Sequence, residues 1–216
     1  EVESVLRESR TKQFVWMEKK FGIELRKGLA CWPEFVELCE RRNLFVHTDG
    51  VVSKQYKKCC TEAGYSWNGL EPAIGSSLGA PAEYFRKACS QTLEVGLKLC
   101  WVLWRKLQPA QGLEQDRSLN RTTFQLISDD RPKLASRLLE FASAEKAWKF
   151  ASTENRLICK LNLAQAYKWS GNREKCFAVV NGEDWTAATA RFRLGVAALR
   201  EEYVEAGKWL VKAVVA

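Results

Sequence analysis

The sequence predicts an all-α fold, a helical bundle followed by helical-hairpin repeats, on three observations. First, apolar side chains recur every three or four residues through nearly all of the long segments, which is the period of a helix. Second, prolines and glycines stand at positions that suit the starts and ends of helices. Third, 46% of the 216 residues are hydrophobic, which is enough for a sizeable core. No segment shows the alternation of apolar and polar residues that is typical of strands.

The first helical pattern covers residues 3–30 and is interrupted at Gly28. A second helix is expected to start with Pro33 in its first turn, because proline has no backbone N–H and the N–H groups of the first turn have no partner within the helix. This helix continues towards Arg42 and ends before the turn signal Thr48-Asp49-Gly50.

A short helix is expected from its N-cap Ser53 to about Glu62. Residues 64–80 hold four glycines and one proline, which predicts a loop. A long helix then follows Pro81 and ends before Pro109, and we expect its two tryptophans to lie in the core. The apolar stripe of this helix consists of Tyr84, Phe85, Ala88, Leu93, Leu97, Cys100, Trp101 and Trp104.

Residues 109–121 are polar and are expected to form a linker, followed by a helix from about residue 121 to the Asp129-Asp130-Arg131-Pro132 break. Pro132 is expected in the first turn of the next helix. From about residue 144 the pattern is one of helical hairpins. The stretch Leu161 to Tyr167, followed by Gly171, loosely repeats in Phe192 to Ala198, and it resembles tetratricopeptide-type repeats.

These elements predict three parts. Residues 1–108 form the helical bundle, residues 109–131 a linker with a short helix, and residues 132–216 the tetratricopeptide-like hairpins. The hairpins are either separate from the bundle or packed with it as one unit.

The formal net charge of +8 favours an anionic partner, with RNA or DNA first among the candidates. The eight cysteines show no CxxC pair and no framework spacing, so we expect reduced, mostly buried thiols in a cytoplasmic protein. The charged start of the chain is unlike a signal peptide, and no run of about 18 apolar residues predicts a membrane span.

Neither a metal nor another cofactor is predicted. A single histidine cannot build a Cys2His2 zinc site, and Asp129-Asp130 is typical of a turn before Pro132. The sequence has no GxxxxGK[ST] or GxGxxG pattern that would hold a nucleotide phosphate.

The stretch that predicts chemistry is Arg42-Asn43-Leu44-Phe45-Val46-His47. Asn43 and His47 are four residues apart and share a helix face, so the Asn43 amide is expected to bond one imidazole nitrogen. Arg42 and His47 are five apart, about 140° on an ideal helix, so they converge only at a helix end or across a two-fold axis. An imidazole can move protons and a guanidinium can hold a phosphate, and together they suit metal-independent RNA cleavage.

This motif resembles the Arg-polar-x3-His signature of the HEPN superfamily (higher eukaryotes and prokaryotes nucleotide-binding domain). The polar residue that follows favours Arg42 over Arg41 as the motif arginine. The continuation Asp49-Gly50-Val51, with Tyr56 beyond it, resembles a subset of bacterial HEPN proteins, although Thr48 stands where related proteins often have Asn. The stretches 161–171 and 184–195 resemble the helical tail of the same kind of protein.

The resemblance implies an up-and-down helical bundle, usually a homodimer in which two motifs face each other. It implies a metal-independent endoribonuclease that leaves a 2′,3′-cyclic phosphate and acts as a toxin, an abortive-infection factor or an anti-phage defence protein, with an antitoxin as a further partner. His47 would then be the acid or base, Arg42 the phosphate ligand, and Asn43 the residue that orients the site.

Two other functions stay open. One is a helical-repeat adaptor in which residues 132–216 bind a partner protein and His47 is dispensable. The other is a catalytically silent protein that binds RNA or a nucleotide, as some members of the resembling family do.

Overall fold

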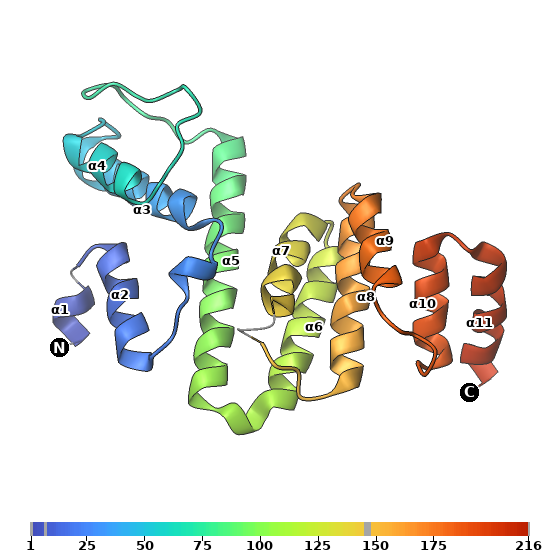
Figure 1. The fold of residues 1–216 in the computed structure, drawn as a ribbon. Helices are drawn as coiled ribbons and strands as arrows, with labels where there is room; N and C mark the ends of the chain where they lie inside the picture. Colours follow the sequence, from blue (N-terminus) through green and yellow to red (C-terminus); the bar gives the residue numbers. More distant parts are fainter. Residues whose placement is uncertain (1, 7, 145–147, 216) are drawn as a thin grey trace. The chain divides into compact units, whose positions relative to one another are not determined.

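The computed structural model describes residues 2–6, 8–144 and 148–215, and in them the predicted all-α class is confirmed. The described residues form helices joined by turns and loops, and their only β-type pairing is an isolated antiparallel bridge between Val51 and Ser77 (Figure 1). The chain divides into two compact units, Glu1–Leu107 and Gln108–Ala216. Each unit has its own interior and is described by itself.

Unit 1 begins with two helices that the sequence had suggested as one interrupted stretch. Helix α2 ends at Gly22, six residues before the break expected at Gly28, because Gly22 adopts a left-handed conformation (φ 61°) and its amide bonds the Glu18 carbonyl as a helix cap. The elements of unit 1 are α1 (Val2–Leu6), α2 (Arg10–Phe21), the 3₁₀ turn η1 (Arg26–Gly28), α3 (Trp32–Thr48), α4 (Lys54–Glu62) and α5 (Ala82–Leu107).

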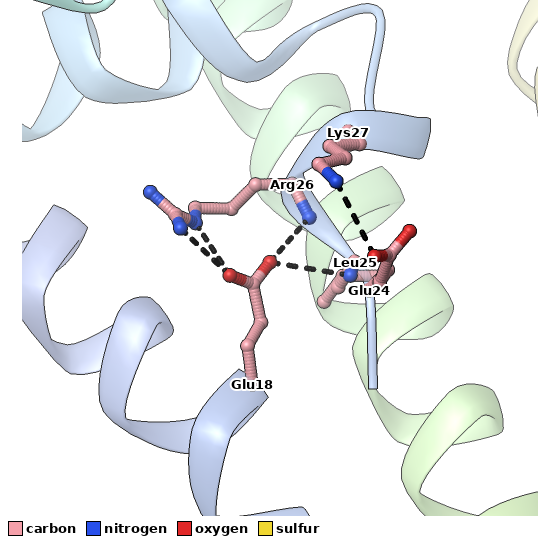
Figure 2. Close-up of polar contacts among 5 residues, drawn as sticks. All are labelled: Glu18, Glu24, Leu25, Arg26 and Lys27. Carbon is pink, nitrogen blue, oxygen red and sulfur yellow. Dashed lines mark hydrogen bonds and ion pairs between the residues drawn. The ribbon is translucent and has the colours of Figure 1, made fainter. Parts of the chain in front are cut away.

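The side chain of Glu18 fixes the connection between α2 and η1 (Figure 2). Its Oε1 accepts the backbone amides of Leu25 (3.2 Å) and Arg26 (2.8 Å), and its Oε2 accepts Nε of Arg26 (2.9 Å). Burial alone would raise the pKa of Glu18, but the bonds from Arg26 and Leu25 hold it below its ordinary value. The amides of Leu25 and Arg26 therefore donate to one side-chain carboxylate, and not to backbone carbonyls as they would within a helix.

Helix α3 starts and ends as predicted. Pro33 lies in its first turn, and Asp49 closes it in a left-handed conformation. At its start, Phe14 of α2 packs against Trp32 and Phe35, with ring centroids 4.9 and 5.9 Å apart. This aromatic contact holds the N-terminal half of α2 alongside α3.

A buried carboxylate, Glu37, ties α3 to α4 and α5. It is 2% exposed and accepts hydrogen bonds from the hydroxyl of Tyr56 (2.6 Å), the hydroxyl of Tyr84 (2.9 Å) and Nε of Arg41 (2.7 Å). Burial together with the Glu37 carboxylate raises the pKa of both tyrosines far above the ordinary value. A charged group this deep is tolerated because all three donors converge on it.

The predicted loop at residues 64–80 is confirmed, and it is fastened to the turn that follows α3. Val52 exchanges backbone bonds with Ser76 and Gly75, and the Leu78 amide bonds the Gly50 carbonyl (2.9 Å). Gly50 has φ 79°, and a Cβ there would lie 2.8 Å from the Leu78 carbonyl oxygen, so the turn requires glycine. The loop thereby fixes the C-terminal end of α3.

The apolar stripe of α5 is only partly in the core. Trp101 is buried, as predicted, and Trp104 is half-buried. In contrast, Phe85 is 62% exposed and Leu97 is only half-buried. The buried face of α5, which includes Ala88 and Trp101, also contains polar residues, among them Glu94 and Lys98, which form a 2.6 Å ion pair.

Unit 2 consists of three successive helical hairpins, α6–α7, α8–α9 and α10–α11 (Figure 1). The linker expected at residues 109–121 is wrong, because α6 already begins at Gly112. The elements are η2 (Pro109–Gln111), α6 (Gly112–Ser128), α7 (Pro132–Ser143), α8 (Thr153–Trp169), α9 (Arg173–Asn181), α10 (Ala190–Arg200) and α11 (Tyr203–Val215).

The same turn closes each of the three hairpins. A residue in the left-handed conformation, Asp130, Gly171 or Glu201, directly follows or lies within two residues of the first helix. In each case the next amide bonds a carbonyl five residues back: Arg131 to Leu126, Asn172 to Tyr167 and Glu202 to Ala197. The α6–α7 pair is thus a hairpin of the same kind as the two that the sequence suggested.

Three of the polar residues that made the start of α6 resemble a linker, Gln115, Asp116 and Asn120, are in fact buried. Asp116 accepts Nε1 of Trp148 (2.9 Å) and the amide of Ala151 (2.7 Å). The amide of Asn120 donates to the Asn155 carbonyl (3.0 Å). Side-chain hydrogen bonds therefore replace apolar contacts at these positions of α6.

All eight cysteines are free thiols, as predicted, but fewer are buried than expected. Cys60, Cys159 and Cys176 are buried, whereas Cys89 and Cys100 are exposed. No helix in the described part of the chain is both long and apolar enough to cross a membrane.

Candidate functional site

The predicted motif residues lie together at a polar pocket of about 530 Å³ in unit 1. Helix α3 supplies Arg42, Asn43 and His47, all from its C-terminal half. The segment at the start of α2 and the residues from Ser53 to Cys59 in and before α4 form the other two walls. The open pocket is therefore lined by three helices, and the loop contacts at Gly50 keep its α3 wall in place.

The two neighbouring arginines of α3 differ in their contacts: Arg41 is bound to other parts of unit 1, whereas Arg42 is exposed in the pocket. Arg41 bonds Glu37, donates to the Gly79 carbonyl (3.0 Å) and lies with its guanidinium carbon 4.1 Å from the centre of the Tyr84 ring. Arg42 is exposed, and its one hydrogen bond to a residue that the structure describes is a long contact of 3.4 Å from Nη1 to Oδ1 of Asn43. This division of roles agrees with the choice of Arg42 as the motif arginine.

Asn43 does not orient His47 in the way that the sequence suggested. Its amide oxygen accepts from Arg42, and its side chain also hydrogen-bonds Glu40. Although Asn43 and His47 share a helix face, no hydrogen bond joins their side chains within the described residues. Asn43 thus links the arginine to a carboxylate in the pocket.

His47 is exposed, and its imidazole makes no hydrogen bond within the described residues. Its neighbour Thr48 is held by the helix end, since its hydroxyl lies 3.0 Å from the Leu44 carbonyl and 3.1 Å from that of Val51. An accessible imidazole at the rim of a polar pocket can exchange protons with a bound molecule.

Two further residues line the pocket that sequence reasoning did not single out. Glu40 lies two turns before His47 on α3, and Arg10 is the first residue of α2. The Arg10 guanidinium donates to Oε1 of Gln13 (2.7 Å) and forms no ion pair with a described carboxylate. The seven-residue spacing of Glu40 and His47 could have indicated that they share a face, whereas nothing in the local sequence brings Arg10 there.

A second, apolar groove of about 700 Å³ runs between α3 and α5 and shares Arg42 with the polar pocket. Its walls include Phe45, which is 40% exposed, and Phe85, which is 62% exposed. An exposed apolar surface beside charged residues is typical of a protein interface.

No cluster of three or more His, Cys, Asp or Glu side chains suited to a metal ion occurs among the residues that the structure describes. Comparison of the chain with protein-family models, with curated proteins and with solved structures gave no match. The geometry of the pocket is therefore the basis for a functional assignment.

Proposed function

We propose that this chain is a metal-independent endoribonuclease that cleaves RNA at the pocket containing Arg42 and His47. The observation that carries the proposal is that the only imidazole of the chain and an uncommitted guanidinium line one open polar pocket. Arg42 would hold the scissile phosphate and His47 would exchange a proton with the RNA. The net charge of +8 favours the approach of a polyanion.

The proposal includes a homodimer. Arg42 borders both the polar pocket and the apolar groove between α3 and α5. In a two-fold interface the same surface meets itself, so a second copy seated on this groove brings a second Arg42 close to the first. Arg42 and His47 point about 140° apart on a single straight helix, and in such a dimer Arg42 of one protomer can face the same phosphate as His47 of the other.

By resemblance to HEPN ribonucleases, the proposed biological setting is a cytoplasmic toxin, abortive-infection or anti-phage defence system, in which an antitoxin or another defence protein restrains the site. The competing function is that of a non-catalytic adaptor. It is favoured by the three hairpins of unit 2 and by the exposed apolar residues of α11, among them Val204 (81% exposed) and Val211 (66%).

The test is to incubate the purified protein with total RNA in EDTA and to compare wild type with His47→Ala. We expect cleavage by the wild type and a loss of at least about 100-fold in the variant, which is the usual contribution of a proton-transfer group. Arg42→Ala should be similarly impaired, while Arg121→Ala, an exposed arginine of α6, removes the same charge and should keep activity. Equal cleavage by wild type and His47→Ala would refute the proposal. Salt-dependent RNA binding without products would instead identify a silent binder.

A further inference from the structure

Cleavage of RNA by its own 2′-hydroxyl requires two proton transfers, and the pocket of each protomer contains only one histidine. One group must take the proton of the 2′-hydroxyl, and another must give a proton to the departing 5′-oxygen. A second group that can exchange protons near neutral pH is therefore needed in the same pocket.

Glu40 is the side chain whose position fits this need. Seven residues on a helix amount to a rotation that returns to within about 20° of the starting direction, so Glu40 and His47 point the same way from α3. They are separated by about 10 Å along the helix axis. In-line displacement places the 2′- and 5′-oxygens on opposite sides of the phosphorus, so a base and an acid must flank the phosphate. Two groups two turns apart on the wall of one pocket meet that requirement.

The surroundings of Glu40 also set it apart from the other carboxylates of the chain. It is half-buried, forms no ion pair with any described cation, and has the Asn43 side chain as its hydrogen-bond partner. Burial raises the pKa of Glu40 above its ordinary value, and the bond from Asn43 only partly offsets this. A half-buried carboxylate without a counter-ion is unfavourable for stability, which favours a functional reason for its presence.

The other charged and titratable groups of the pocket come from two neighbouring elements. Glu8 and Arg10 face it from the start of α2, and Tyr56 and Cys59 face it from α4. Glu8 is already paired with Lys12 at 2.7 Å, and the hydroxyl of Tyr56 donates its hydrogen bond to Glu37. Burial raises the pKa of the Cys59 thiol, so it stays neutral. None of these groups competes with Glu40 as a base.

We propose that Glu40 is a catalytic residue of this site, the general base for the 2′-hydroxyl of bound RNA, with His47 as the general acid. The inference rests on the proposed ribonuclease function. Glu40 accepts the 2′-hydroxyl proton while the 2′-oxygen bonds to phosphorus. The bond from phosphorus to the 5′-oxygen breaks, and protonated His47 gives its proton to that oxygen. The products are a 2′,3′-cyclic phosphate and a 5′-hydroxyl. Proton exchange with solvent then restores both side chains.

The test measures initial rates of cleavage of total RNA in EDTA for wild type, Glu40→Gln, Glu40→Asp and Glu62→Gln. Glu62 is an exposed carboxylate of α4, so its amide variant is a control for the loss of one negative charge. We expect Glu40→Gln to lose at least about 100-fold in rate, Glu40→Asp to recover part of it, and Glu62→Gln to match the wild type. RNA binding by Glu40→Gln should be retained, because it has one fewer negative charge.

The pH profile separates catalysis from a structural effect. The wild-type rate should fall on the acid side as Glu40 becomes protonated, and this limb should be absent from the residual activity of Glu40→Gln and present in Glu40→Asp. If Glu40→Gln cleaves as fast as Glu62→Gln while His47→Ala is inactive, the role of Glu40 is refuted and the proposed function stands. If wild type does not cleave, or His47→Ala cleaves equally well, both proposals fail.

Discussion

The buried carboxylate of Glu37 gives the sharpest prediction about stability. Replacing it by alanine removes the acceptor of three hydrogen bonds, from Tyr56, Tyr84 and Arg41, at 2.6, 2.9 and 2.7 Å. Hydrogen bonds to a charged group contribute about 1.5–3 kcal/mol each, but the three act as one network and do not add. Removal of one partner of a buried ion pair costs about 3–5 kcal/mol, and we expect Glu37→Ala to lower the free energy of unfolding of unit 1 by this amount.

The assay is urea unfolding combined with hydrogen exchange of the amides in α3 and α4. The exchange measurement is needed because the two units need not unfold together, and it reports α4 separately from unit 2. Tyr84→Phe, which removes only one of the three donors, should cost about 1 kcal/mol and serves as the graded control. A loss below about 1 kcal/mol for Glu37→Ala, with unchanged exchange in α4, would show that this network does not hold the helices together.

Two further predictions concern the pH dependence of stability and the association of the chain. Because the pKa of Glu18 lies below its ordinary value of 4.5 in the folded chain, its bonds to Arg26 stabilise the fold above that pH and are lost as the pH falls through the folded-state pKa. Thermal unfolding of wild type should therefore lose more stability than Glu18→Gln on acidification below 4.5, and parallel curves would contradict this. Phe85→Asp places a charge in the apolar groove and should shift sedimentation from dimer to monomer, whereas a wild type that is monomeric at all concentrations would exclude the proposed dimer.

The helix boundaries around the motif could be predicted because they depend on local signals. Pro33 suits the first turn of α3, where its missing N–H would have no partner within the helix. The hydroxyl of Ser53 accepts a hydrogen bond from the Tyr56 amide at the start of α4, and Gly50 adopts a positive φ that other residues rarely adopt. Each signal acts within a few residues of its effect. Arg42 and His47, which the sequence singled out as a motif, line one pocket, and their role in catalysis stays a prediction.

The first half of α6, before about residue 121, was not predicted as helix because most of its buried residues are polar. Hydrophobic periodicity assumes that buried positions are apolar, and Asp116, Asn120 and Thr123 break that assumption by bonding partners that are mostly distant in the sequence. The reverse error occurred in α5, where Phe85 is apolar but exposed. Periodicity shows that a helix has an apolar face, but it does not show what covers that face.

The composition of the pocket was only partly predictable for the same reason. The contact that brings Arg10 towards His47 depends on the packing of Phe14 against Trp32 and Phe35, which joins two helices. The expected bond from Asn43 to His47 is absent among the described residues, and the amide oxygen of Asn43 accepts from Arg42 instead, a partner that the four-residue spacing did not indicate.

The most direct test of the proposed chemistry is the end group left on RNA by wild type and by His47→Ala in EDTA. Attack by the 2′-hydroxyl predicts fragments that end in a 2′,3′-cyclic phosphate, with no cleavage at a position where the 2′-hydroxyl has been replaced by hydrogen. We expect these ends from the wild type and almost none from His47→Ala. Fragments with a 3′-hydroxyl, cleavage that requires a metal ion, or cyclic ends that are equally abundant without His47 would contradict the account.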